Sequence, residues 1–122
     1  KQISVAGQIP FWNGALSGFG KVGHDMTTED AAKIARICGL NLIAQVKAAC
    51  DGDLDKVVRV VKLGGFVNCT EAFLDHPEVI NGASDLMVDV FGDKGTHSRF
   101  AVGVNSLPRG VAVEIDGIFE VH

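Results

Sequence analysis

The chain has 122 residues, of which 47% are apolar and 21% are charged, and its net charge is -4. This length suits one domain that buries a core without disulfide or metal crosslinks. The acidic balance argues against a protein that binds nucleic acid regardless of sequence, because such proteins are normally basic. Every apolar run is too short to span a membrane, so we expect no membrane partner.

The three cysteines Cys38, Cys50 and Cys69 match no zinc-binding spacing, and their number is odd. An odd set without a metal pattern is typical of free thiols in a reducing compartment. We therefore expect a cytoplasmic protein.

The first part of the chain predicts a short strand, a loop and a long helix. Gln2–Ala6 has strand character, and the glycine-rich stretch Asn13–Gly23 predicts a long loop or a loose hairpin. Thr27 and Asp30 have the spacing of a capping box, which marks a helix start. Apolar residues then recur at helical spacing as far as Cys50.

The second part predicts a strand, a helix and two further strands. Val57–Val67 is rich in β-branched residues, which favours a strand. A helix is expected from near Asp75 to Gly92, followed by strands over Ser98–Val104 and Val111–Val121. Two amphipathic helices then cover one face of a sheet of at least four strands. We expect partner subunits to cover the other face.

The glycine motif and the histidines of the chain do not predict a nucleotide site or a metal site, and no motif of a catalytic nucleophile is recognisable. The stretch from Gly18 to Gly23 reads G-x-G-x-x-G, but the next helix starts only at Thr27, so it does not open a helix as a dinucleotide site requires. The histidines form no metal pair, and neither a serine elbow nor a Cys-His pair stands out. Only His97 attracts attention, because it lies two residues before Arg99.

Arg99 and Glu114 are the most informative polar residues. Arg99 stands near the start of an apolar strand, where an unpaired charge is costly. It is therefore either part of a structural salt bridge or solvated strand edge, or a two-pronged anchor for a carboxylate. Glu114 has the same ambiguity. If both side chains point into one cleft, Arg99 can hold an anion and Glu114 can handle a proton or a water molecule.

The order of motifs resembles the RidA (YjgF/YER057c/UK114) family, also called L-PSP endoribonucleases. The matching segments, in chain order, are Ala6–Pro10, Val60–Val67, Ile80–Phe91, Ser98–Arg99, Leu107–Pro108 and Val113–Ile115. The resemblance implies a chorismate-mutase-like α/β (α+β) fold, a mixed sheet with two helices on one face. It also implies a homotrimer whose sheets enclose a central barrel. We expect residues 1–122 to form one such domain that lacks the family's first strand.

The resemblance also implies a function. It implies an enamine/imine deaminase that hydrolyses reactive 2-imino acids to 2-keto acids and ammonia, without a metal or an organic cofactor. By this likeness Arg99 binds the substrate carboxylate and Glu114 activates water in a cleft between subunits. Gly7, Asn81 and Ala101 are expected to bind the substrate in that cleft. Ala101 stands where the family has a cysteine that imine hydrolysis does not require.

Two alternatives remain open at this point. In the first, the same cleft binds a small carboxylate or amino acid without turnover, as a regulatory module does. In the second, the protein cleaves RNA. The net charge of -4 and the lack of a basic, aromatic-lined surface in the sequence argue against nucleic acid as a partner.

Overall fold

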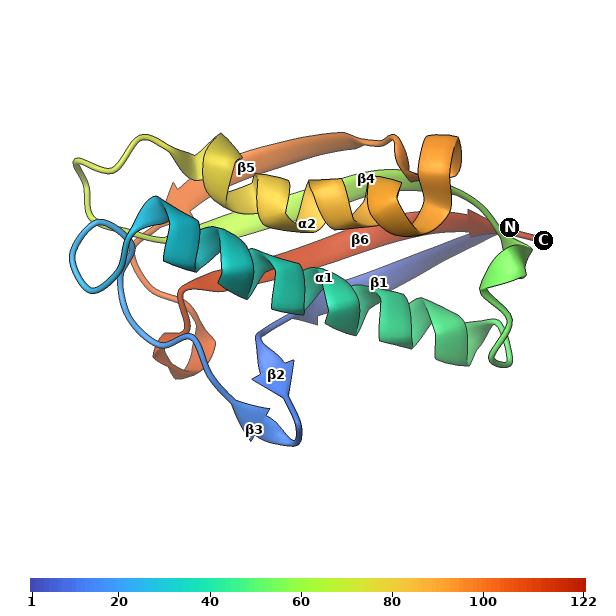
Figure 1. Cartoon of the computed structure of the whole chain (residues 1–122), viewed down its shortest axis with the longest axis horizontal. Coiled ribbons are helices and arrows are strands. Elements are labelled where there is room, and N and C mark those ends of the chain that lie inside the picture. Colours follow the sequence, from blue (N-terminus) through green and yellow to red (C-terminus); the bar gives the residue numbers. More distant parts are fainter.

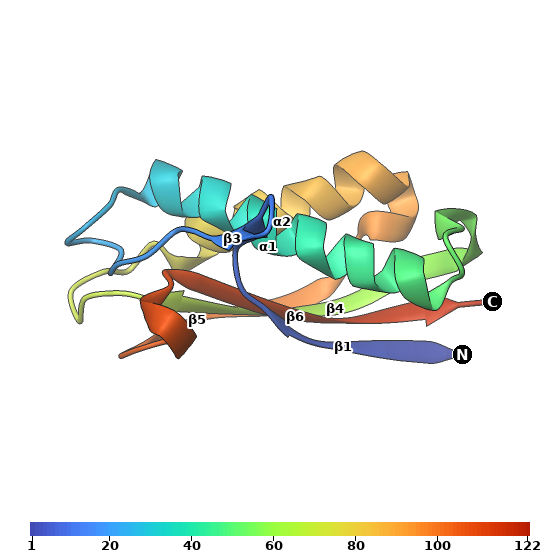
Figure 2. The same cartoon turned by 90° about the horizontal axis from the view of Figure 1, so that it is seen from below.

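A computed structural model describes all 122 residues and shows a four-stranded sheet with both long helices on one of its faces (Figure 1). The main elements are β1 (Gln2–Gln8), α1 (Thr28–Ala49), β4 (Val57–Asn68), α2 (His76–Phe91), β5 (Ser98–Val104) and β6 (Val113–Val121). The view along the sheet in Figure 2 shows the helices in one layer and the strands in the other. The predicted architecture is thereby confirmed.

The sheet has the order β1-β6-β4-β5. β5 runs parallel to β4, whereas β6 runs antiparallel to both β4 and β1, so the sheet is mixed. The parallel pair is joined through α2, which is the connection that parallel strands need. β5 and β1 are therefore the two edges of the sheet.

Both helices begin and end at the signals seen in the sequence. The Thr27 hydroxyl accepts a hydrogen bond from the Asp30 amide at 3.2 Å, which caps the start of α1. Pro77 occupies the first turn of α2, and Gly92, with φ of 62°, ends that helix.

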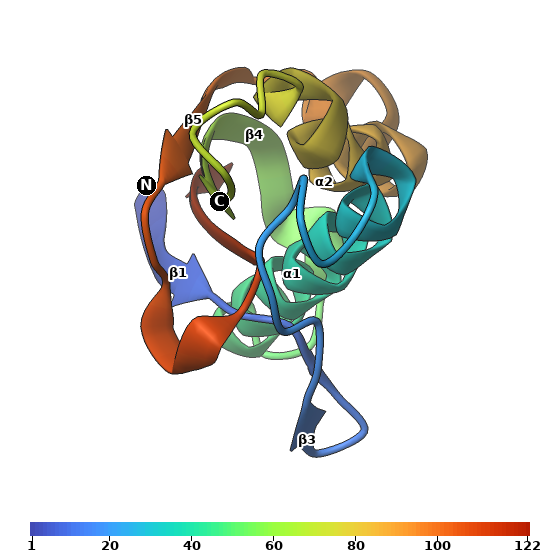
Figure 3. The same cartoon turned by 90° about the vertical axis from the view of Figure 1, so that its left-hand side faces the viewer.

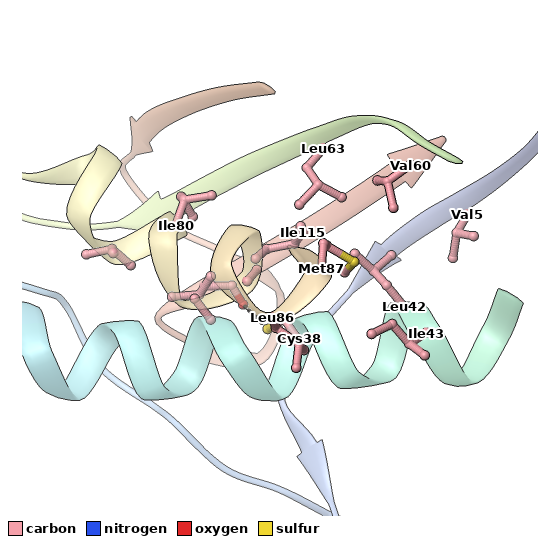
Figure 4. Packing of buried hydrophobic residues seen from close by; sticks show 14 of the residues in the cluster. Val5, Cys38, Leu42, Ile43, Val60, Leu63, Ile80, Leu86, Met87 and Ile115 are labelled. Atoms are coloured by element: carbon pink, nitrogen blue, oxygen red, sulfur yellow. Dashed lines mark hydrogen bonds between the residues drawn. The ribbon is translucent and has the colours of Figure 1, made fainter. Parts of the chain in front are cut away.

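The core lies between the helices and the sheet (Figure 4). Leu42 and Cys38 of α1 and Leu86 and Met87 of α2 face Ile115 of β6, and all five are buried. Burying apolar surface of this kind is the main stabilising contribution to such a fold. All three cysteines are free and buried.

The glycine-rich stretch contains more structure than a loop. β2 (Phe11–Trp12) and β3 (Ala15–Leu16) form a small hairpin that projects from the domain (Figures 1 and 3). Its turn uses Asn13 and Gly14, both with positive φ, which is the geometry that tight hairpins require. Of the two expected forms, the hairpin is therefore the one found for its first part.

Three strand boundaries differ from the predicted ones, and the smallest difference is in β4, which ends at Asn68 instead of Val67. β1 continues to Gln8, with a bulge between Val5 and Gln8 that the sequence did not indicate. β6 begins at Val113, because the amide of Ala112 bonds to the Gly18 carbonyl instead of a neighbouring strand. Short 3-10 turns cover Leu54–Lys56, Gly92–Gly95 and Pro108–Gly110. Neither α1 nor α2 is long and apolar enough to cross a membrane.

Candidate functional site

Arg99 lies on the helix-covered face of the sheet. It pairs with Leu63 of β4, whose side chain is fully buried beneath the helices. Because directly paired residues point to the same face, the guanidinium is directed toward α2. The prediction that Arg99 stands near the start of the penultimate strand is confirmed.

Two uncharged oxygens of α2 hold the Arg99 guanidinium. Nη1 donates to the Ser84 hydroxyl at 3.0 Å, and Nη2 donates to the Pro77 carbonyl at 3.3 Å. The salt bridges of the chain join other residues, so no carboxylate of this chain neutralises Arg99. Of the structural interpretations that the sequence left open, the salt bridge is not what the structure shows, whereas β5 is an edge strand and Arg99 is half-buried on it. A guanidinium has five N–H groups, so three remain for a ligand.

His97 extends this arrangement by one more residue. Its Nδ1 lies 2.6 Å from the Gly95 carbonyl, and its Nε2 lies 2.9 Å from the Ser84 hydroxyl. Since a carbonyl can only accept, Nδ1 donates to Gly95, and Nε2 shares a hydrogen bond with the Ser84 hydroxyl. The result is a continuous chain from Gly95 through His97 and Ser84 to Arg99, which fixes the position of the guanidinium.

The other two residues expected beside Arg99 lie close to it in the fold. Asn81 is exposed on α2, four residues after Pro77 and three before Ser84, so it shares the helix face that receives the guanidinium. It forms no hydrogen bond with Arg99. Ala101 pairs with Gly65 of β4 and lies on the helix-covered face, one alternation along β5 from Arg99.

Glu114 lies on the opposite face of the sheet. It pairs with Phe66, whose ring packs against Phe100 on the face that the helices do not cover. Burial and the nearby Asp116 carboxylate raise the pKa of Glu114 above its ordinary value. The carboxyl group lies against Gly7, where a β-carbon would be 2.8 Å from Cδ of Glu114. The structure thus brings Glu114 and Gly7 together.

Arg99 and Glu114 therefore do not meet within one chain. Each belongs to a separate group of residues: Arg99 with Ser84, Asn81 and Ala101 near α2, and Glu114 with Gly7 on the open face. The single chain holds a fixed guanidinium near α2 and, separately, a carboxyl group of raised pKa on the open face.

The sequence reasoning missed a second pair of reactive groups. Cys69 Sγ lies 3.5 Å from His76 Nε2, although their spacing of seven residues gives no recognisable motif. The bend between β4 and α2 brings them together. The Gly18–Gly23 stretch opens no helix, as expected. Its Lys21 instead donates to the Asn68 side chain at 2.9 Å. No group of three metal-ligating side chains gathers anywhere in the chain.

The fold is a mixed α+β domain in which two helices cover one face of a four-stranded sheet. Residues 1–113 match the family described as "YjgF/chorismate_mutase-like, putative endoribonuclease", and the chain belongs to that family. The resemblance to RidA/YjgF proteins is thereby confirmed, together with the chorismate-mutase-like fold.

Relatives and solved structures agree with this assignment. Protein TCP17 of Trypanosoma cruzi is 44% identical, and the match covers 99% of this chain and 76% of that protein. The crystal structure of Atu1372 from Agrobacterium tumefaciens, a protein of unknown function, is 45% identical with a TM-score of 0.98 and covers 99% of this chain and 76% of its own. An endoribonuclease-like protein of Shewanella oneidensis is 32% identical, with a TM-score of 0.95 and coverage of 98% and 79%.

Proposed function

We propose that the protein binds small 2-imino carboxylates through Arg99 and hydrolyses them to 2-keto acids and ammonia, as an enamine/imine deaminase. The proposal rests on the hydrogen bonds of Arg99 and on its lack of a carboxylate partner. Its guanidinium is held in place by Ser84 and Pro77, yet its charge has no carboxylate partner in the chain. A fixed arginine of this kind suits two-pronged binding of a carboxylate.

Substrate orientation follows from this contact. The carboxylate of a 2-imino acid is bonded directly to the carbon of its C=N group. Holding the carboxylate in a rigid fork therefore also fixes the carbon that water attacks, which lowers the barrier by removing rotational freedom. Asn81 and Ala101 flank the guanidinium along α2 and β5, where they would contact the remainder of the substrate.

Glu114 would supply the acid–base step. Its raised pKa brings it closer to neutral pH, where a carboxyl group both accepts and returns a proton readily. In the proposed reaction its carboxylate takes a proton from the attacking water and passes it to the imine nitrogen, which gives a carbinolamine. The same carboxylate then moves the proton of the new hydroxyl group to the nitrogen, so that ammonia leaves as the C=O bond forms. The reaction as written consumes one water and needs no other reagent.

Because Arg99 and Glu114 lie on opposite faces of one sheet, this mechanism requires more than one copy of the chain. We propose a homotrimer in which the Gly7–Glu114 group of one copy faces Arg99 of the next. The uncovered face of the sheet supports such an assembly, since Phe66 and Phe100 form an aromatic pair there and Val102 is 42% exposed. The free thiols are consistent with a cytoplasmic setting.

The test generates 2-iminobutanoate with a threonine dehydratase and times the release of the keto acid with and without the protein. Wild-type protein should accelerate release. Arg99→Ala should abolish the acceleration, and Arg99→Lys should retain little of it, because a lysine keeps the charge and loses the fork. Lys94→Ala, at an exposed position outside both groups, is the matched control. No acceleration by folded wild-type protein would overturn the proposal.

A binding protein without turnover is the second candidate, and one observation favours it. The fixed guanidinium and the residues that hold it belong to one chain, whereas Glu114 lies across the sheet from them. The solved structure of E. coli TdcF, which shares this fold at 21% identity and a TM-score of 0.64, contains bound serine. Thermal stabilisation by 2-ketobutyrate that depends on Arg99 but not on Glu114, with no keto-acid release, would establish this alternative.

A further inference from the structure

A cavity of about 450 Å³ lies at the N-terminal end of α2, apart from the Arg99 guanidinium. Its lining includes Cys69, Glu71, Phe73, His76 and Gly103. Gly103 stands four residues after Arg99 on β5, a separation of about 13 Å along a strand. The cavity thus lies beside the same edge strand as Arg99 but away from its guanidinium.

A thiol and an imidazole meet in this cavity. Cys69 Sγ and His76 Nε2 are 3.5 Å apart, within the reach of a sulfur hydrogen bond. The Phe73 ring packs edge-on against the imidazole, with centroids 5.5 Å apart and planes at 83°. This packing holds the ring so that Nε2 is directed at the sulfur. A nucleophile beside an oriented base is the arrangement that activates cysteine for attack.

Gly103 makes room for the pair. A β-carbon at this position would lie 2.6 Å from His76 Nε2 and 2.8 Å from Cys69 Sγ, and real β-carbon contacts are essentially never that short. The thiol and the imidazole therefore sit side by side directly over the glycine backbone of β5. Any other residue there would push one of them away.

The surroundings of Cys69 raise the pKa of its thiol overall, although two effects oppose each other. Burial raises the pKa of its thiol, and the positive charge of Lys21 acts in the opposite direction. Lys21 Nζ also donates to the Cys69 carbonyl at 3.4 Å and to the Asn105 carbonyl, so it is fixed beside the cysteine. The thiol consequently needs a neighbouring base when it attacks, and His76 is in place to accept its proton.

The other two cysteines provide a contrast. Cys38 is fully buried in the core, where its Sγ donates to the Val113 carbonyl at 3.5 Å. Burial and the nearby Glu114 raise the pKa of Cys38 strongly. Cys50 is buried at the end of α1. Neither has a histidine beside it, so only Cys69 combines a base with a cavity.

We propose that Cys69 and His76 form a nucleophilic pair that adds covalently to small, uncharged electrophiles with a carbon–carbon double bond conjugated to a carbonyl group. The sulfur bonds to the β-carbon as the S–H bond breaks, and His76 Nε2 takes the proton. The electron pair of the double bond passes to the α-carbon and carbonyl, and His76 then returns the proton to the α-carbon. One S–C and one C–H bond form, without oxidant or reductant.

The lining selects the class of ligand. Phe73, Leu74 and Val104 provide apolar surface for a small carbon skeleton, and Asn105 and Thr70 provide hydrogen-bonding groups for a carbonyl. The Glu71 carboxylate lines the cavity, whereas the Lys21 ammonium is bound to the Cys69 and Asn105 carbonyls and is not part of the lining. The charge that faces a ligand is therefore negative and repels an anion. This preference is the reverse of that proposed for Arg99, where an anionic ligand is expected, so the two sites are suited to different molecules.

The test treats wild-type protein with one equivalent of N-ethylmaleimide, an uncharged activated alkene, and maps the adduct by mass spectrometry. Cys69 should carry nearly all of it, and should react at least about tenfold faster near pH 7 than N-acetylcysteine. Cys69→Ser should remove the adduct. A rate equal to that of the free thiol, or labelling spread over Cys38 and Cys50, would overturn the proposal.

The role of His76 is tested separately. His76→Gln should slow labelling about tenfold or more near pH 7, while His122→Gln, at the exposed C-terminus, should not change the rate. Unchanged labelling of a folded His76→Gln protein would overturn the role of the base. Should that variant unfold, the rate of Cys69 in the wild-type protein relative to N-acetylcysteine still decides whether the thiol is activated. The preferred charge of the ligand has its own test: iodoacetamide should react much faster with Cys69 than anionic iodoacetate, beyond the ratio for N-acetylcysteine. An equal ratio contradicts the selection by Glu71.

Discussion

The carboxyl group of Glu114 lies against the α-carbon of Gly7, in the space that a side chain at residue 7 would fill. A β-carbon there would be 2.8 Å from Cδ and 3.0 Å from Cγ of the glutamate. The two residues come from β1 and β6, which are neighbours in the sheet. The position of the carboxyl group therefore depends on the absence of a side chain on an adjacent strand.

Gly7→Ala should consequently displace Glu114 without unfolding the protein, because the end of a glutamate side chain can move. We expect keto-acid release to fall at least about tenfold, with a change in Tm of only a few degrees. Ala6→Ser, at the neighbouring exposed position, should preserve the rate. Full activity of Gly7→Ala would show that the placement of Glu114 does not matter for the reaction.

Ser84→Ala should weaken carboxylate binding by removing the hydroxyl that joins Arg99 to His97. A hydrogen bond to a charged group contributes about 1.5–3 kcal/mol, so KM or the Kd of a keto acid should rise about tenfold or more. Asp85→Asn, one residue along α2 and exposed, provides the comparison. Titration of 2-ketobutyrate by calorimetry measures both, and equal affinities would exclude the positioning role of Ser84.

Glu114→Gln should change how stability depends on pH. The pKa of Glu114 is raised in the folded protein above its ordinary value of 4.5, so the folded state binds this proton more tightly than the unfolded state does. The stability that protonation provides is present at low pH and is lost as pH rises through the raised pKa.

The Tm of Glu114→Gln minus that of wild type should therefore increase from about pH 4 to about pH 8. Glu120→Gln, on the same strand, removes an exposed ion pair with Arg59 and should shift Tm little. Parallel melting curves of wild type and Glu114→Gln across this range would contradict the raised pKa. Keto-acid release should be lost in Glu114→Gln in either case.

Gly82→Ala should destabilise the fold although alanine favours helices. A β-carbon at residue 82 of α2 would collide with the backbone carbonyl of Ala32 in α1, and a backbone group cannot move aside cheaply. We expect a loss of about 2 kcal/mol or more in the free energy of unfolding, measured by urea denaturation. Asp85→Ala on the exposed face of α2 should stay within about 0.5 kcal/mol of wild type.

The long elements could be predicted because their signals are local. The Thr27 cap, the apolar spacing of α1 and the β-branched run of β4 each determine the structure of their own segment. The hairpin of β2 and β3 was only loosely foreseen, since its strands are two residues long. The bulge near Gly7 was not foreseen, because it arises from pairing with β6, more than a hundred residues away.

The site could be predicted in part. Arg99 is recognisable as a charge on an apolar strand, and the resemblance of the chain to the family predicts that this arginine binds the carboxylate of a substrate. Ser84 and His97 could not be assigned as its support, because that depends on how α2 packs against β5. For the same reason the pair of Cys69 and His76 has no sequence signature: the turn between β4 and α2 brings them together.

The position of β5 at the edge of the sheet has a consequence for motion. Its backbone is paired on one side only, with β4, so its amides should open to solvent more often than those of β4 or β6, which are paired on both sides. Arg99 links this strand to α2 through Ser84 and Pro77. A ligand bound to the guanidinium would add a further link, so deuterium uptake along Ser98–Val104 should slow when the site is occupied. The rate of amide hydrogen exchange in this one strand would then show whether a ligand occupies the site at Arg99, whether or not the ligand is consumed.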